Sequence, residues 1–287
     1  MAKRQLTATE AFDLRQALHV ATLDALMASR RWEPGDLVFQ GGTSLHLAHG
    51  SPRFSEDLDF LVNATLKLES ISAAIKTRLD GTHWFPADTN LTVSKSKDGR
   101  NPHAFVVTIG GPDVIGAVRV KVELWQTNKA TLSAIKAVVA PVKLARGPAA
   151  GMQAFVPTAD LPEIYADKVF ALAARPYLKP RDVFDLHWLS QHGSLHTCSV
   201  NDLRMRLATY PNETPSAWLD KAIARRSELR QSTTAITNDL KRWLPSSWPL
   251  NEASVNDMVA TSVQALEHGI DRMQEIEAQH RSDNASL

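Results

Sequence analysis

The pattern of apolar residues changes near residue 150, and this change restricts the folds that the chain can adopt. Before residue 150, short apolar runs typical of β-strands alternate with segments of helical spacing. After it, almost every segment has helical spacing, with Pro and Gly at the joins. We therefore predict an α+β fold. A mixed sheet with flanking helices is expected in residues 1–150, followed by a mostly helical domain in residues 151–287.

Apolar periodicity also predicts the individual elements. In the first domain we expect helices over residues 8–30, 43–50 and 66–81, and strands over 35–40, 57–62, 91–97, 103–110 and 118–127. In the second domain we expect helices over 159–175, 180–191, 199–209, 215–242 and 253–279. Thr7 or Thr9 is a suitable N-cap for the first helix, and Gly50 is suited to end the second.

The bulk composition removes several classes of protein. The chain has 287 residues and a formal net charge of +1, so total charge does not indicate a nucleic-acid or membrane partner. Its single cysteine, Cys198, excludes an internal disulfide and a multi-cysteine zinc site. No apolar run is long enough for a transmembrane helix, and the N-terminus lacks the apolar segment of a signal peptide. We therefore expect a cytoplasmic protein without a membrane partner.

Two acidic residues interrupt the apolar strand "DLDFLV". Residues two apart on a strand share a face, so Asp57 and Asp59 are expected to project together while Leu58 and Phe60 face the core. Neighbouring carboxylates repel each other, and a divalent cation relieves the repulsion. Mg²⁺ is bound by one or two carboxylates together with substrate phosphates. The alternative is an exposed edge strand on which water solvates both acids.

A glycine turn precedes this strand. Gly41, Gly42, Thr43 and Ser44 follow an apolar strand and open a short helix. Such a turn presents backbone N–H groups at a helix N-terminus, where phosphate binds well, and the two hydroxyls add donors. A Gly-Gly turn alone indicates only a turn. Together with the paired acids, it predicts a site in which one part binds a triphosphate and the other holds metal ions.

A third acid is available on the strand 118–127. Val118, Val120 and Val122 alternate with polar residues, which puts Glu123 on the polar face. Glu123 is a candidate third ligand in a cluster that holds two metal ions. The alternative is an ion pair with Arg119 or Lys121 on a solvated face.

The predicted helix 159–175 carries a lysine within its apolar stripe. Ile164, Tyr165, Ala171 and Leu172 are the helical neighbours of Lys168. An ammonium group there is costly unless it reaches an anion such as a phosphate or an aspartate. The alternative is that the side chain extends to solvent.

The next predicted helix contains two aspartates. Asp182 follows Pro180 in the first turn, where a helix N-terminus stabilises an acid without any other role. Asp185 borders the apolar stripe and has no such explanation. Asp185 is therefore the preferred site residue and Asp182 the second candidate. We predict that Lys168 and Asp185 form a buried pair that orients phosphates and helps to deprotonate an acceptor hydroxyl.

These residues together resemble a known family. The stretch "GGTSLHLAHGSPRFSEDLDF" is similar to the signature of the AbiEii/AbiGii-type nucleotidyltransferase toxins, which belong to the DNA polymerase β-like superfamily. The signature is matched by Gly41, Gly42, Thr43, Gly50, Arg53, Ser55, Asp57 and Asp59. Lys168 in "YADKVFALAARP" and "RDVFDL" at residues 181–186 resemble two later motifs of the family.

The resemblance implies a polymerase β-like fold and a Mg²⁺-dependent transfer of a nucleoside monophosphate from an NTP to an acceptor hydroxyl. Asp57, Asp59 and Glu123 would hold two Mg²⁺ ions, and Lys168 and Asp185 would complete the catalytic set. The predicted nucleotide-binding residues are Gly41, Gly42, Thr43, Ser44, Arg53, Ser55, Arg181 and Asp182. Arg53 and Lys168 would stabilise charge on the phosphates.

Related proteins act as toxins of bacterial toxin–antitoxin pairs, some in phage defence, and some add nucleotides to tRNA ends. The resemblance therefore implies an RNA acceptor, the end of a tRNA, and a cognate antitoxin protein as partner. Two alternatives stay open. The same fold also modifies small molecules such as aminoglycosides, or proteins. A chain of this fold can also serve as a non-catalytic binding module, which would predict the loss of a metal-binding carboxylate.

Overall fold

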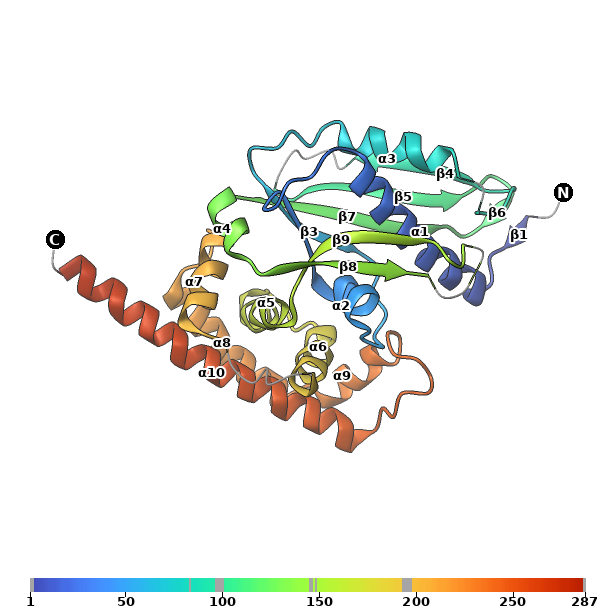
Figure 1. The fold of residues 1–287 in the computed structure, drawn as a ribbon. Helices are drawn as coiled ribbons and strands as arrows, with labels where there is room; N and C mark the ends of the chain where they lie inside the picture. Colours follow the sequence, from blue (N-terminus) through green and yellow to red (C-terminus); the bar gives the residue numbers. More distant parts are fainter. Residues whose placement is uncertain are drawn as a thin grey trace. The chain divides into compact units, whose positions relative to one another are not determined.

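The computed structural model describes residues 3–82, 84–95, 101–144, 147, 149–192 and 198–285 (Figure 1). The chain divides into two compact units. The first unit comprises Met1–Gly50 and Ser55–Ala159, and the second comprises Ser51–Phe54 and Asp160–Leu287. A short segment between the glycine turn and the paired acids thus belongs to the second unit, although it lies early in the sequence.

A seven-stranded mixed sheet forms the centre of the first unit, with the strand order β4-β5-β7-β3-β2-β9-β8. Its strands are β2 (Leu37–Gln40), β3 (Leu58–Asn63), β4 (Asn90–Lys95), β5 (His103–Gly110), β7 (Val118–Thr127), β8 (Ala137–Lys143) and β9 (Gln153–Ala159). Strand β3 is parallel to β7 and antiparallel to β2, and β2 is parallel to β9. Two shorter strands, β1 (Arg4–Gln5) and β6 (Val114–Ile115), form a separate parallel pair.

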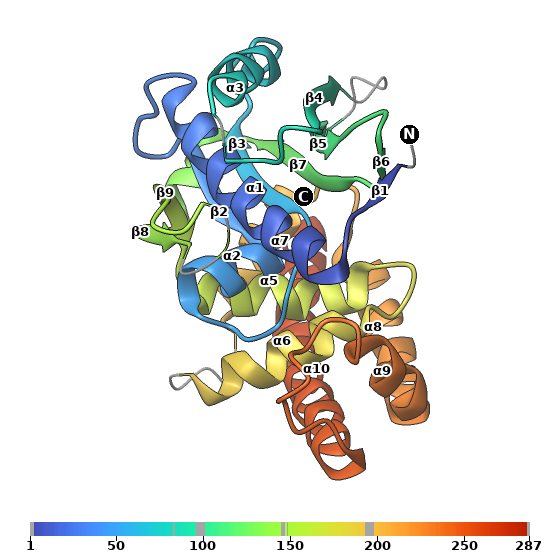
Figure 2. The same cartoon turned by 90° about the vertical axis from the view of Figure 1, so that its right-hand side faces the viewer.

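One face of this sheet is covered by helices and holds the core of the unit. The helices of the first unit are α1 (Ala8–Ala28), α2 (Gly41–His49), α3 (Ile71–Asp80) and α4 (Lys129–Ala134). Helix α1 runs across the sheet, as Figures 1 and 2 show, and its N-cap Thr7 accepts a hydrogen bond from the Glu10 amide. Phe39 and Phe60 stack beneath it with ring centroids 5.0 Å apart. Each fully buried side chain of this kind contributes roughly 1.5–3 kcal/mol.

The second unit is helical. Its helices are α5 (Leu161–Ala174), α6 (Pro180–Gln191), α7 (Val200–Thr209), α8 (Pro215–Gln231), α9 (Thr233–Leu240) and α10 (Glu252–Ala285). Helix α10 packs against α6 and α8. Trp218 is fully buried, and its indole N–H donates to the carbonyl of Phe170 at 3.0 Å. Burial with a satisfied donor makes this tryptophan a core anchor of the helical unit.

The α+β fold class is confirmed, with most predicted elements present and several corrections. The predicted helix 215–242 is two helices, because the backbone leaves helical geometry at Ser232, whose hydroxyl donates to the carbonyl of Glu228. The helix predicted over 66–81 begins only at Ile71. Strands β1, β6, β8 and β9 and helix α4 were not predicted. In β8 the apolar residues Val138 and Val139 are exposed, so the alternation of apolar and polar residues that identifies strands in sequence is absent.

No helix within the described residues is both long enough and apolar enough to cross a membrane.

Candidate active site

The glycine turn lies directly against one of the paired acids. Strand β2 ends at Gln40, which is in register with Asp59 on β3, and helix α2 begins at Gly41. Gly41 has φ +80°, and a Cβ on it would lie 2.7 Å from Oδ2 of Asp59. Both the backbone conformation and the close approach therefore require glycine here. The sequence predicted that the glycine turn lies close to the paired acids, and the structure shows this closeness for Asp59.

The third acid lies beside the second. Strands β3 and β7 are parallel, and Asp59 is in register with Glu123. Residues in register share a face of the sheet, so the two half-buried carboxylates project to the same side, opposite the apolar core. Asp57 directly precedes β3, and its carbonyl accepts a hydrogen bond from the hydroxyl of Thr43. Three acids thus gather where β3 begins.

A lysine adjoins the three acids. Nζ of Lys121 lies 2.6 Å from Oε1 of Glu123, two residues along the same strand. The hydrogen bond to Glu123 raises the pKa of Lys121, and the charges of Asp57 and Asp59 raise it further, while burial lowers it. The ion-pair alternative for Glu123 is therefore realised. The raised pKa of Lys121 means that Glu123, Asp57 and Asp59 together favour the charged form of the lysine.

The donor set fits a hard divalent cation in part. Carboxylate oxygens are the ligands that Mg²⁺ prefers, and Glu123 already pairs with a cationic side chain, Lys121. Among the described residues, however, no group of three His, Cys, Asp or Glu side chains is arranged to hold a metal ion. The geometry thus suits a metal held by one or two carboxylates and by substrate phosphates. The assignment of Glu123 as a metal ligand stays a prediction.

The hydroxyl groups of the glycine turn are used within the protein. Thr43 donates to the Asp57 carbonyl, and the hydroxyl of Ser44 donates to the carbonyl of Gly41 at 2.9 Å. Both side chains are fully buried. Gln40 at the N-cap makes no side-chain capping hydrogen bond, so no side-chain acceptor there competes for the first amides of α2. The backbone of the turn, more than its hydroxyls, is suited to bind phosphate.

A buried ion cluster forms a second group of predicted residues, within the helical unit. Nε and Nη2 of Arg53 donate to the two carboxylate oxygens of Asp185 at 2.6 and 2.8 Å, and Nη1 donates to the carbonyl of Phe54 at 2.8 Å. Arg53 is 2% exposed and Asp185 0%. All three guanidinium nitrogens therefore have protein acceptors.

Lys168 joins both aspartates of helix α6 in this cluster. Its Nζ lies 2.6 Å from Oδ1 of Asp182 and 2.7 Å from Oδ2 of Asp185. Burial alone would raise the pKa of both acids. The positive charges of Lys168 and Arg175 instead hold the pKa of Asp182 below its ordinary value. Those of Arg53 and Lys168 do the same for the pKa of Asp185. The predicted buried pair of Lys168 and Asp185 is present. Asp182 is an equal partner, which its spacing of three from Asp185 on one helix face could have indicated.

Arg181 lies beside the segment that carries Arg53. Its guanidinium carbon lies 4.2 Å from the ring centroid of Trp243, and the amide of Phe54 donates to the Trp243 carbonyl at 2.8 Å. Arg181 thus packs on an aromatic face. Its assignment to nucleotide binding stays a prediction.

The predicted site residues therefore form two sets, one in each unit. The first unit holds Gly41, Gly42, Thr43, Ser44, Ser55, Asp57, Asp59 and Glu123, and the second holds Arg53, Lys168, Arg181, Asp182 and Asp185. Sequence reasoning offered the ion pair of Lys121 with Glu123 as an alternative, but it missed Asp185 as the partner of Arg53. A contact across 132 residues leaves no local signal.

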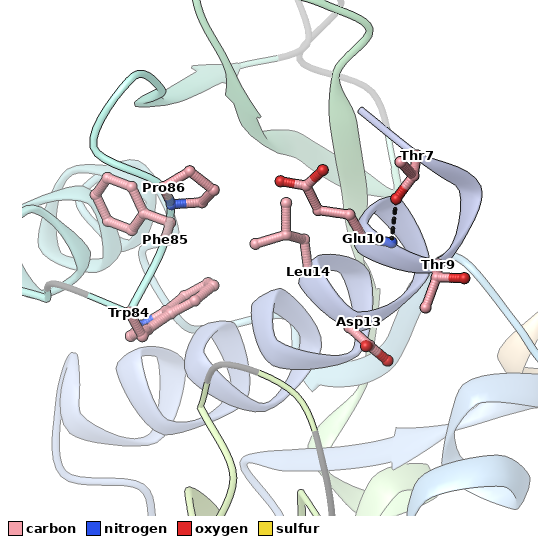
Figure 3. Close-up of a pocket in the computed structure, with 8 residues that line it drawn as sticks. All are labelled: Thr7, Thr9, Glu10, Asp13, Leu14, Trp84, Phe85 and Pro86. Atoms are coloured by element: carbon pink, nitrogen blue, oxygen red, sulfur yellow. Dashed lines mark hydrogen bonds between the residues drawn. The ribbon is translucent and has the colours of Figure 1, made fainter. Parts of the chain in front are cut away.

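A cavity of about 490 Å³ lies elsewhere in the first unit (Figure 3). It is lined by Thr7, Thr9, Glu10, Asp13, Leu14, Trp84, Phe85 and Pro86, none of which is a predicted site residue. The lining contains two acids and no basic side chain, which is unsuited to a triphosphate. The carboxylate of Glu10 also accepts two hydrogen bonds from Arg4.

Comparison with protein families identifies the chain. The profile described as "Nucleotidyl transferase AbiEii toxin, Type IV TA system" matches residues 24–247. The chain belongs to the AbiEii nucleotidyltransferase toxin family. It is accordingly an enzyme of the nucleotidyltransferase class from a toxin–antitoxin system, and the matched range includes every predicted site residue of the AbiEii-type chain.

Solved structures support the AbiEii-type fold. JHP933 from Helicobacter pylori is 20% identical with a TM-score of 0.50, and the match covers 98% of each chain. A putative nucleotidyltransferase from H. pylori is 18% identical with a TM-score of 0.51, covering 93% of this chain and 99% of that one. The nucleotidyltransferase toxin MenT4 from Mycobacterium tuberculosis is 16% identical with a TM-score of 0.53, covering 95% and 87%. These likenesses concern the fold alone. A comparison with curated proteins found no match.

Proposed function

We propose that this AbiEii-family toxin transfers a nucleoside monophosphate from an NTP to a hydroxyl of RNA, with Mg²⁺, and that its acceptor is the end of a tRNA. The observation that supports the proposal is the contact between Gly41 and the carboxylate of Asp59. It joins a turn suited to phosphate with an acidic group suited to a cation in one small region.

The chain's own residues have defined tasks in this reaction. The backbone amides of Gly41 to Ser44 would bind the β- and γ-phosphates. Asp57 and Asp59, with Glu123, would hold Mg²⁺, which when bound lowers the pKa of the acceptor hydroxyl and neutralises charge on the departing pyrophosphate. The acceptor hydroxyl gives up its proton to water and its oxygen forms a bond to the α-phosphorus, as the bond from the α-phosphorus to the bridging oxygen breaks and pyrophosphate leaves. The sheet would keep Asp59 and Glu123 on one face throughout, because their strands are in register.

The proposal is tested by incubating the protein with each labelled NTP, total cellular RNA and Mg²⁺, and by resolving the labelled RNA. The wild-type protein should label an RNA of tRNA size, and Asp59→Asn should abolish labelling. Asp24→Asn is the matched control, because Asp24 is an exposed acid of the same unit that pairs with Arg78. Labelling of an aminoglycoside instead of RNA would contradict the proposed acceptor.

A toxin of this kind should also arrest growth when expressed without its antitoxin. Asp59→Ala should relieve the arrest, and Asp24→Ala should not. The contribution of Lys168 and Asp185 is tested separately, by Asp185→Asn. Full transfer activity in that variant would remove Asp185 from the catalytic set.

A further inference from the structure

The edge of the seven-stranded sheet carries an unusual charge pattern. Between Glu123 and Asp160 the sequence contains no acidic residue, and its four basic residues are Lys129, Lys136, Lys143 and Arg146, the last of which lies outside the described residues. This stretch includes β8 and β9, and β8 is the edge strand. This stretch of the sequence therefore carries basic residues with no acidic residue between them.

The same hairpin exposes apolar side chains. Val139 on β8 is 66% exposed and Phe155 on β9 is 54% exposed. Phe155 is in register with Pro141, and Val139 is in register with Pro157. We name this surface the β8–β9 patch, and it consists of Val139, Pro141, Lys143, Gln153, Phe155 and Pro157. Exposed apolar groups next to a lysine indicate a binding surface and not a solvated edge.

Strand register puts the β8–β9 patch on the face of the sheet that carries the acids. Phe39 is in register with both Phe60 and Thr158, so these three share the apolar face. Asp59 and Phe155 lie at alternate positions on their strands and therefore share the opposite face. Strand β9 is the second strand over from β3, and the β9 residue level with Asp59 is Ala159. Phe155 lies four residues before Ala159 along β9. Strand spacings give a separation of roughly 16 Å, which a few nucleotides of single-stranded RNA can span.

We infer that the β8–β9 patch binds the single-stranded segment of the RNA acceptor, with Phe155 stacking on a base and Lys143 contacting the phosphate backbone. This inference rests on the proposed function. Proteins that bind single-stranded RNA combine exposed aromatic rings with positive charge in this way. An added protein strand is the competing occupant, and Pro141 and the two lysines at the ends of β8 disfavour it, because Pro and Lys on an edge strand oppose strand pairing.

The first experiment measures binding without chemistry. The probe is a short fluorescein-labelled single-stranded RNA, and its Kd is determined by anisotropy at several salt concentrations without NTP. We expect Phe155→Ala to weaken binding about five-fold or more and Phe155→Trp to retain it. Lys143→Glu should weaken binding and reduce its salt dependence. Ile115→Ala and Lys67→Glu are matched controls, because both residues are exposed in the same unit outside the β8–β9 patch.

The second experiment measures steady-state transfer. Phe155→Ala should raise the KM for RNA and leave the KM for NTP unchanged, a separation that a general loss of folding would not produce. If the protein labels RNA but Phe155→Ala and Lys143→Glu change neither the KM nor the Kd for RNA, the inference is wrong and the proposed function stands. If wild type binds RNA through Phe155 but transfers nothing, the proposed acceptor is wrong and the surface stands. Unchanged RNA binding together with selective binding of a Glu-Val repeat peptide would assign the edge to a protein strand and overturn the inference.

Discussion

Arg53 and Asp185 form a bidentate, fully buried ion pair although 132 residues separate them in the sequence. The pair fixes the segment Ser51–Phe54 within the helical unit, and Lys168 adds a second cation to the same carboxylate. Arg53 precedes Asp57 by only four residues. The segment Ser51–Phe54 is therefore held by a contact within the helical unit.

Removal of Arg53 should destabilise the protein strongly. Arg53→Ala leaves Asp185 buried with one cation fewer, and breaking a buried pair costs about 3–5 kcal/mol. Urea unfolding would measure the loss. Arg242→Ala is the control, because Arg242 is exposed and lies 3.9 Å from Asp239, a contact worth about 1 kcal/mol or less. Equal stability of the two variants would contradict the structural role of Arg53.

Gly41 and Gly50 allow a second matched comparison. Both have φ +80°, but a Cβ on Gly50 would meet nothing within 4 Å, whereas a Cβ on Gly41 would meet the Asp59 carboxylate. Gly50→Ala should therefore cost about 1 kcal/mol of backbone strain and leave transfer activity unchanged. Gly41→Ala should also displace Asp59 and reduce kcat by about 100-fold. Thermal unfolding and transfer rates separate the two effects, and equal activity of both variants would be the contrary outcome.

Lys121 should compete with the metal for Glu123. Its ammonium group holds Oε1 of Glu123 at 2.6 Å and is stabilised by Asp57 and Asp59. Lys121→Gln removes the ammonium group from Glu123, so we expect the Mg²⁺ concentration at half-maximal activity to fall about two- to five-fold. A titration of activity with Mg²⁺ measures this, with Lys67→Gln as control. A higher Mg²⁺ requirement in Lys121→Gln would show that the lysine supports metal binding.

His19 should make the first unit sensitive to acid. Burial lowers the pKa of His19 from 6.5 to about 4, the hydrogen bond to the Glu56 carbonyl opposes this shift, and the nearby His46 and Arg15 add to it. The unfolded chain therefore binds a proton below pH 6.5 that the folded protein takes up only near pH 4. Stability should fall by about 3 kcal/mol as the pH drops through this window.

Unfolding in urea at a series of pH values checks this expectation. His19→Gln keeps a neutral polar side chain and should flatten the profile between the two pKa values. An unchanged profile would mean that other groups control the acid response of the first unit.

The sequence predicted the parts of the fold that have local signals. In strand β7 buried residues alternate with more exposed ones from Val118 to Trp125, and the bounds of the strand were predicted without error. Gly50 ends α2 in the left-handed conformation, as expected from a glycine after a helical pattern. Strand β8 was missed because Val138 and Val139 are adjacent and both exposed, which removes the alternation.

The candidate site was predictable only in part, for a physical reason. Asp57 and Asp59 are unusual in the strand that the sequence predicts, and Lys168 is unusual in its own helix, so each could be identified from its neighbours. The pairing of Arg53 with Asp185, and the register of Asp59 with Glu123, depend on how distant segments meet. Arg53 was assigned to phosphate on the basis of its motif, and the structure gives all three of its nitrogens protein acceptors.

The inclusion of Ser51–Phe54 in the helical unit means that the two units cannot be separated by one cut in the gene. A fragment that starts at Asp160 would lack the guanidinium that neutralises Asp185 and the amide that bonds to Trp243. Expression of the helical half alone would then require the short peptide to be supplied in trans or grafted onto a terminus.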